Sequence, residues 1–182
     1  MNIPGLTDEN VEIYAMEHPK CEAAYGGKRI GLWDLPEFII DMIRREAFSD
    51  KVAMKTFREE GITDKNVILE MWAWCNLGRY DLVPDVVVKT GKINKEYHDC
   101  GKRDKCPLEF RRCSRISVDG ERITPRETKY IRYVANGYSN KEIASKMHQQ
   151  ASSMISLGQN VKSKLKVPNN AAVAAFVMKS ML

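Results

Sequence analysis

Four side chains that could bind a metal ion lie close together near the middle of the chain. The segment YHDCGKRDKCPLEFRRC contains His98, Cys100, Cys106 and Cys113. Thiolate and imidazole groups are the usual ligands of tetrahedral zinc, and a bound metal would order a segment that has few apolar residues. These four residues therefore predict a zinc site.

Other interpretations of the cysteines stay open. The segment has no paired C-x2-C knuckle, so its cysteines could instead hold an iron–sulfur cluster, form a redox-active thiol pair or remain plain reduced thiols. Cys21 or Cys75 could replace His98 as the fourth ligand if the fold brings one of them near. An odd total of five cysteines without a secretion signal argues against a disulfide framework.

The chain lacks the arrangements that are typical of enzyme active sites. None of its three histidines lies in an H-E-x-x-H pattern, and we find no G-x-S-x-G, Walker-type or G-x-G-x-x-G segment. The N-terminus is acidic and interrupted by Pro4 and Gly5, and no apolar run approaches the roughly 20 residues that span a bilayer. We therefore expect a cytoplasmic protein that is not an enzyme and has no membrane partner.

Positive charge is concentrated in the last third of the chain. Residues 121–182 contain ten Lys or Arg against three Glu, a net charge of +7, whereas the whole chain carries +5. A basic segment attached to a nearly neutral body is typical of a protein with a polyanionic partner. Ordinary surface lysines are the alternative explanation.

Two capping boxes organise this basic segment. Thr124 and Glu127 form the first, followed by a helix that Gly137 ends, and Ser139 and Glu142 form the second, which opens a short helix. A polar corner follows at 148–151. Two helices joined in this way either pack into an α-helical core or lay the second helix in a DNA groove.

Two further helices are expected after the corner. Met154, Val161 and Leu165 keep helical spacing and give the third helix a buried face. Asn169 or Asn170 can cap a last helix, AAVAAFVMKSML.

The basic segment resembles the helix-turn-helix domain of the LuxR (GerE-type) family of bacterial transcription regulators. The matching residues fall in register without a gap: Thr124, Pro125, Arg126, Glu127, Ala135, Gly137, Ser139, Asn140, Lys141, Glu142, Ile143, Ala144, Lys164, Leu165, Val167 and 171–174. The resemblance implies a four-helix DNA-binding domain whose helix near 152–164 enters the major groove. It ends near residue 120, so the input signals usual in the family do not carry over.

The resemblance also indicates which side chains would contact DNA. Gln159 and Asn160 could read an adenine edge, and Ile155 could meet a thymine methyl group. The full expected set is Arg126, Lys141, Lys146, Ser152, Ser153, Ile155, Ser156, Gln159, Asn160, Lys162, Lys164 and Lys166, with the basic members on phosphates.

Some residues depart from the family pattern. Gln149 and Gln150 stand in the turn, and Gly158 in the third helix costs about 1 kcal/mol against Ala. These departures predict a corner looser than usual.

The last helix carries more apolar residues than a short helix needs for packing beneath it. We expect a homodimer through Val173, Phe176, Val177 and Met181. The alternative is a helix buried in its own domain.

The N-terminal body is expected to be helical. Thr7, Asp34 and Asp64 are candidate N-caps, and they place helices near 8–17, 36–48, 50–60 and 65–77. The expected inward-facing residues are Phe38, Met42, Ile43, Ala47, Val67, Ile68, Met71, Trp74 and Cys75.

A faint repeat runs through the same region. GLTDENV at 5–11 recurs as GITDKNV at 61–67, and LPEFI at 35–39 echoes VPDVV at 83–87. This pattern indicates either a duplicated helical unit or two uses of one favourable N-cap.

Together these features predict a mainly α protein. A helical N-terminal body at 1–97 is joined by a Cys/His-rich hinge at 98–119 to a four-helix LuxR-type domain at 120–182. The predicted function is a sequence-specific, DNA-binding transcription regulator whose input is unknown. The alternative is an interaction protein that keeps the helix-turn-helix scaffold without base readout and acts on another regulator or on RNA polymerase.

Overall fold

The computed structural model describes residues 3–97, 100–103, 105–114, 116–118 and 121–180. The chain divides into two compact units, Met1–Ser114 and Arg115–Leu182. Most of the segment predicted as a hinge, up to Ser114, therefore belongs to the first unit. Each unit is described on its own below.

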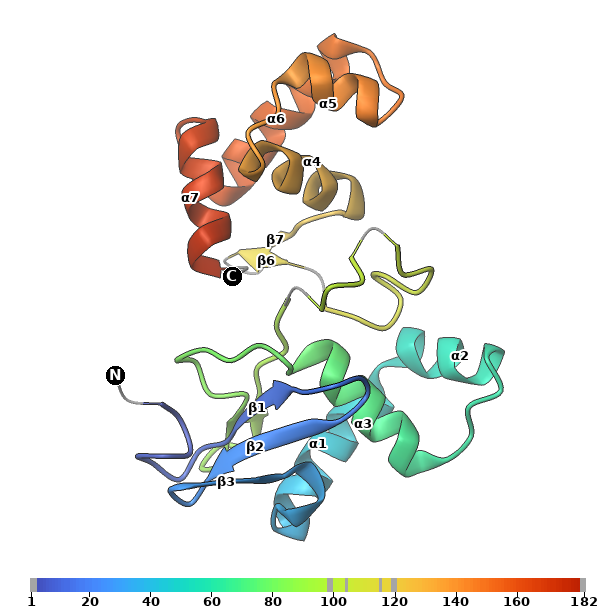
Figure 1. Cartoon of the computed structure of the whole chain (residues 1–182), viewed down its shortest axis with the longest axis vertical. Helices are drawn as coiled ribbons and strands as arrows, with labels where there is room; N and C mark the ends of the chain where they lie inside the picture. Colours follow the sequence, from blue (N-terminus) through green and yellow to red (C-terminus); the bar gives the residue numbers. More distant parts are fainter. Residues whose placement is uncertain (1–2, 98–99, 104, 115, 119–120, 181–182) are drawn as a thin grey trace. The chain divides into compact units, whose positions relative to one another are not determined.

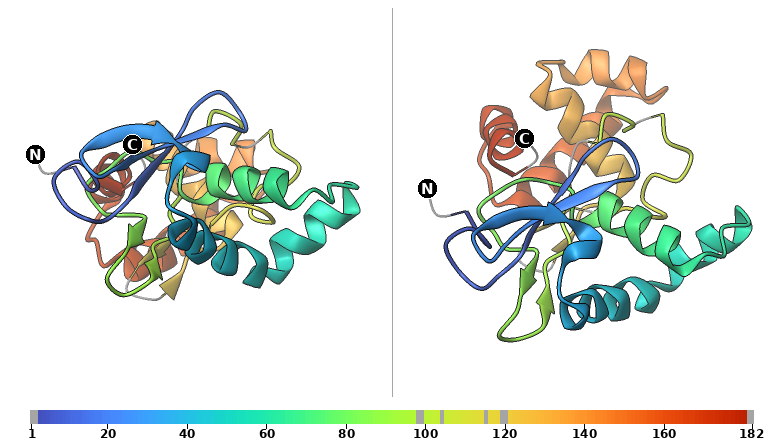
Figure 2. Two further views of the ribbon diagram at one scale, coloured as in Figure 1. Left: turned by 90° about the horizontal axis from the view of Figure 1, so that it is seen from below. Right: turned by 60° about the horizontal axis from the view of Figure 1, so that its bottom comes forward.

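The first unit is built from a small antiparallel sheet and three helices. Strands β1 (Glu12–Ala15), β2 (Cys21–Tyr25) and β3 (Lys28–Gly31) form the sheet in that order. A 3-10 turn, η1 (Leu32–Asp34), leads into α1 (Glu37–Ser49), α2 (Lys51–Glu59) and α3 (Lys65–Asn76). Helix α3 packs against β1, β2 and α1, while α2 extends away from the sheet (Figures 1 and 2).

A second short hairpin completes this unit. Strand β4 (Val86–Val87) pairs with β5 (Lys92–Ile93), and an isolated bridge joins Val11 to Val86. The core between sheet and helices contains fully buried side chains from every layer, including Ile13, Ile39 and Trp72. Each such side chain contributes about 1.5–3 kcal/mol by its removal from water.

The helix predicted at 8–17 is wrong, because this stretch ends in β1. Val11, Ile13 and Tyr14 are β-branched or aromatic residues that suit a strand. Before the strand, the Asp8 carboxylate accepts hydrogen bonds from the Gly5 and Asn10 N–H groups, which is a turn and not a helix cap.

The strands correct the predicted fold class. The N-terminal unit contains antiparallel sheets, so the protein is not strictly mainly α. Strands β2 and β3 are joined by the two-residue loop Gly26–Gly27, and both glycines have positive φ. That loop is a sequence signal for a hairpin, since a type I′ turn needs positive φ at both central positions.

The other three helices of the body are confirmed, but their inward faces differ in part. Phe38 is 48% exposed and Val67 is 43% exposed, whereas Ile39, Ile40 and Leu69 are buried. Asp64 caps α3 as predicted by accepting from the Asn66 and Val67 N–H groups. Asp34 lies in η1, however, and α1 starts after Pro36.

The two copies of the faint repeat fold differently. The copy at 5–11 leads into strand β1, whereas the copy at 61–67 leads into helix α3. In the second pair, the segment 35–39 contains the start of α1, whereas the segment 83–87 ends in strand β4. The likeness therefore reflects shared turn and cap residues and not a duplicated helical unit.

The second unit consists of a short hairpin and the four predicted helices. Strands β6 (Ser117–Val118) and β7 (Glu121–Arg122) pair, and α4 (Pro125–Ala135), α5 (Asn140–Lys146), α6 (Ala151–Leu165) and α7 (Asn170–Ser180) follow. Both predicted capping boxes are present, at Thr124 with Glu127 and at Ser139 with Glu142. Helix α4 packs on α6 and α7, and α5 packs on α6.

Helix α7 buries part of the surface expected to form a dimer contact. Val173 and Val177 are buried within their own unit, and Phe176 is half-buried. Met181 lies outside the described residues. No helix within the described part of the chain combines the length and the apolar character that crossing a membrane requires.

Candidate nucleic-acid interface

One face of α6 is open to solvent and polar. Ser152, Ser156, Gln159 and Asn160 are exposed, and Ile155 beside them is 51% exposed. Ser153 is half-buried, whereas Met154, Gly158, Val161 and Leu165 face the core. The exposed residues and the buried residues therefore lie on opposite faces of α6, as helical spacing requires.

Two further residues refine this face. Ser163 is also exposed and lies three or four positions beyond Asn160 and Gln159, so helical spacing alone could have identified it. Leu157, on the same helix, is half-buried. The sequence of α6 contains no Asp or Glu, so its exposed face presents no negative charge to a polyanion.

The corner before α6 is a tight turn. His148 adopts a left-handed conformation with φ of 52°, and the Gln149 N–H donates to the Ala144 carbonyl at 2.9 Å. Gln150 occupies the N-cap position without a side-chain capping bond among the described residues. Arg126 on α4 donates to the Gln149 side-chain oxygen at 3.2 Å, which ties the corner to the first helix of the unit.

Tyr130 of α4 contacts both α5 and α6. Its hydroxyl donates to Asn140 Oδ1 at 2.9 Å at the start of α5. Gly158 of α6 lies against it, since a Cβ placed there would be 2.2 Å from the hydroxyl oxygen. The glycine predicted as a mere weakness of α6 is therefore required by the approach of Tyr130.

The expected phosphate-binding side chains differ in their surroundings. Lys164 donates to Glu127 Oε2 at 3.0 Å and to the Arg122 carbonyl at 3.4 Å, so it braces α6 against the start of α4. Burial raises the pKa of Glu127, but hydrogen bonds from the Thr124 N–H and from Lys164 outweigh it and leave the pKa below its ordinary value. The Lys146 ammonium lies 4.5 Å from the centre of the Tyr138 ring.

The other basic side chains are more open. Arg126, Lys141 and Lys166 are exposed, and Lys162 is half-buried. Lys166 follows α6 as its C-cap in a left-handed conformation with φ of 54°. The unit therefore combines a polar helix face with basic side chains on α4, α5 and the end of α6, which can approach a phosphate backbone.

This four-helix geometry agrees with a known family. Residues 121–177 match the family model GerE, the bacterial regulatory proteins of the luxR family. The C-terminal unit is a GerE domain, as predicted. No curated protein and no solved structure shows a significant match to the chain.

We call Arg115–Leu182 the GerE unit. The match includes α4, α5, α6 and most of α7, so the helices that build the polar face belong to the family's domain. It supports a DNA-binding helix-turn-helix regulator.

The predicted zinc ligands lie outside this unit. His98 is outside the described residues, and Cys100, Cys106 and Cys113 are half-buried free thiols. Within the described parts of the chain, no group of three or more His, Cys, Asp or Glu side chains is arranged to hold a metal ion. Zinc binding there stays a prediction.

Two buried carboxyl groups of the first unit, those of Glu12 and Asp85, and the half-buried one of Glu96 were not identified from the sequence. Asp85 accepts from the Ile13 N–H at 2.6 Å, Glu12 accepts from the Asp81 N–H at 2.6 Å and Glu96 accepts from the Arg79 N–H at 2.5 Å. Burial raises the pKa of Glu12 to about 8 and also raises the pKa values of Asp85 and Glu96. No sequence spacing unites these residues, because β1 and the loops after α3 bring them together.

Proposed function

We propose that this protein is a transcription regulator that binds a specific double-stranded DNA sequence through the GerE unit. The proposal rests on the exposed face of α6, where Gln159, Asn160 and Ile155 stand on a helix without acidic residues. Amide side chains can bond an adenine edge through two hydrogen bonds, and an aliphatic side chain suits a thymine methyl group. These three residues are the proposed base-reading set.

Phosphate contacts would provide most of the affinity. The proposed phosphate contacts are Arg126, Lys141, Lys146, Lys162 and Lys166, whereas Lys164 is paired with Glu127 at 3.0 Å. Because each neutralised phosphate contributes about −0.9 to the log–log salt slope, five contacts give a slope of roughly −4.5. Binding should therefore weaken steeply between low and physiological salt.

The decisive experiment selects bound fragments from random DNA and then compares two variants on the selected site. Gln159→Ala should cost about 1–3 kcal/mol on that site and leave non-specific binding nearly unchanged, because base contacts specify. Lys162→Ala is the matched control from the same helix. It should weaken specific and non-specific binding alike and reduce the salt slope by about one contact.

A second candidate function is supported by Ile155. Ile155 is aliphatic and 51% exposed on the open face of α6, so it could also contact the surface of another protein, such as another regulator or RNA polymerase. This candidate takes precedence if Gln159, Asn160 and Ile155 can all be replaced by Ala without a change in sequence preference.

A homodimer through α7 would depend on half-buried Phe176 and on Met178, which is 64% exposed.

A further inference from the structure

Helix α2 and the chain on either side of it line an open groove of about 590 Å³ in the first unit. Its apolar side chains come from the end of α1, from α2, from the turn after α2 and from α3, and they are Phe48, Met54, Ile62 and Ile68. Ile68 is buried and the other three are half-buried. Sites for small molecules commonly have volumes of about 300–1,000 Å³ and apolar linings, so the groove has the size and the floor of such a site.

The rim of the groove is basic. Its charged residues are all exposed and all positive, and they are Lys51, Lys55, Arg58 and Lys65. The three on α2 follow one another at spacings of four and then three residues, so they lie along one face of that helix, together with Met54. The described lining residues include no Asp or Glu.

Carboxylates neutralise little of this positive charge. Within the described part of the chain, Lys55 pairs with Glu59 at 3.8 Å, but no ion pair forms at the other three basic residues of the rim. Asp50 and Asp64 accept backbone N–H groups as the N-caps of α2 and α3. The groove therefore combines an apolar floor with positive charge, which suits a ligand that is apolar along its length and negative at one end.

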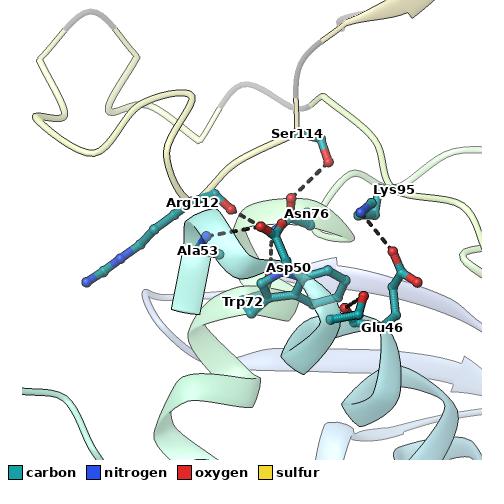
Figure 3. Close-up of polar contacts among 9 residues, drawn as sticks. Glu46, Asp50, Ala53, Trp72, Asn76, Lys95, Arg112 and Ser114 are labelled. Carbon is teal, nitrogen blue, oxygen red and sulfur yellow. Dashed lines mark hydrogen bonds and ion pairs between the residues drawn. The ribbon is translucent and has the colours of Figure 1, made fainter. Parts of the chain in front are cut away.

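Both ends of α2 are held in place. At its start, the Asp50 carboxylate accepts from the Ala53 N–H at 3.0 Å (Figure 3). Near its end, the Arg112 Cζ atom lies 4.1 Å from the centre of the Phe57 ring. The Arg112 carbonyl in turn accepts from Asn76 Nδ2 at 2.8 Å, which ties this residue to the end of α3 (Figure 3). A groove fixed in this way loses little conformational freedom when it binds a ligand.

We propose that this groove binds an aliphatic chain with one anionic head group, of the chemical class of a long-chain carboxylate. The chain lies on the floor formed by Met54, Ile62 and Ile68. The head group pairs with Arg58, whose guanidinium can offer two parallel N–H groups to a carboxylate, and the neighbouring lysines add positive charge. The proposal does not depend on DNA binding by the GerE unit.

Two features favour a small amphiphile over a macromolecule. Sites for single-stranded nucleic acid offer aromatic platforms to successive bases, whereas Phe48 is the sole aromatic residue among the described lining residues. A standard protein interface uses about 20–30 residues on each side. Nine described residues line the groove.

The test titrates the full chain with sodium decanoate, below the concentration at which micelles form, in an isothermal titration calorimeter. We expect one molecule to bind per chain. Three further probes separate the two parts of the ligand: butanoate has a short chain, decanol has no charge, and decyltrimethylammonium has the opposite charge. Each should bind at least about tenfold more weakly, because each lacks either most of the apolar surface or the ion pair.

Variants locate the site. Arg58→Glu should weaken decanoate binding about tenfold, because an attraction is replaced by a repulsion of similar size. Lys92→Glu is the matched control, since Lys92 is exposed on β5, lies outside the groove lining and gives the same change in net charge. Arg58→Gln should give a smaller loss and serves as the second variant if the charge reversal disturbs folding, which circular dichroism checks.

Several results would overturn the proposal. It fails if decanoate does not bind, if decanol or the cation binds as well as decanoate, or if Lys92→Glu weakens binding as much as Arg58→Glu does. It also fails if Arg58→Glu weakens the binding of polyglutamate or of double-stranded DNA more than that of decanoate, because the groove would then serve a macromolecule. None of these results bears on base reading by Gln159, which the DNA selection tests separately.

Discussion

Gly158 and Tyr130 illustrate how one atom decides the effect of a substitution. Helix propensity alone favours Ala over Gly by about 1 kcal/mol inside a helix. At position 158, however, the added Cβ would lie 2.2 Å from the Tyr130 hydroxyl oxygen and 2.9 Å from its Cζ atom. Steric overlap in a packed core outweighs the propensity gain.

We therefore predict that Gly158→Ala lowers the free energy of unfolding by about 1–3 kcal/mol. Thermal unfolding followed by circular dichroism would measure the change. The same substitution in a Tyr130→Phe background should cost less, because the nearest atom is then absent and the two residues are coupled. A higher melting temperature for Gly158→Ala would contradict the packing described here.

At the scale of elements, the carboxyl groups of Glu12, Asp85 and Glu96 make β1 and the loops after α3 sensitive to pH. Glu12 has its pKa raised by burial from 4.5 to about 8, and Asp85 and Glu96 shift in the same direction. The folded state therefore binds protons that the unfolded chain has already lost above pH 4.5. Their stabilising effect is fully present below that value and is lost as the pH rises through about 8.

We predict that the free energy of unfolding of the first unit falls between pH 5 and pH 8.5, on the order of 3 kcal/mol. All three tryptophans belong to this unit, so urea unfolding followed by tryptophan fluorescence reports on it selectively. Glu12→Gln should flatten the dependence, because an amide cannot lose the proton. A stability that rises across this range would refute the assignment.

The same scale shows what the sequence could and could not predict. The helices α4 and α5 were predictable because their capping boxes are local patterns, and the structure contains both. The sheet was missed because strand pairing joins distant residues, although the Gly26–Gly27 turn was a usable signal.

The candidate interface was likewise predictable only in part. Helical spacing correctly places Ser152, Gln159 and Asn160 on the open side of α6. The pairing of Lys164 with Glu127 and the approach of Tyr130 to Gly158 depend on contacts between helices. Contacts between different helices do not follow any regular spacing in the sequence, so periodicity cannot predict them.

At the scale of the whole molecule, each unit has its own hydrophobic core. The buried side chains of the GerE unit include Ile131, Ile143, Met154 and Val161, whereas the core cluster around Trp72 consists of residues from the first unit. A compact unit with its own core can in principle fold alone.

We predict that a fragment spanning residues 115–182 folds independently. Far-ultraviolet circular dichroism should show a helical spectrum, and heating should give one cooperative transition with a stability of about 3–5 kcal/mol, as expected for so small a core. The fragment with Ile131→Ala, which empties part of that core, is the control and should unfold at a markedly lower temperature. A fragment without helical signal would show that the GerE unit needs the rest of the chain.

The contact between Tyr130 and Gly158 also constrains how this chain can diverge. A larger residue at 158 is tolerated only after the side chain at 130 has shrunk, whereas a smaller residue at 130 leaves a void until 158 grows. Neither position can drift on its own without a loss of stability. Descendants of this sequence should therefore keep both Tyr130 and Gly158 or replace both. Where both are replaced, a smaller residue at position 130 should appear before a larger residue at position 158.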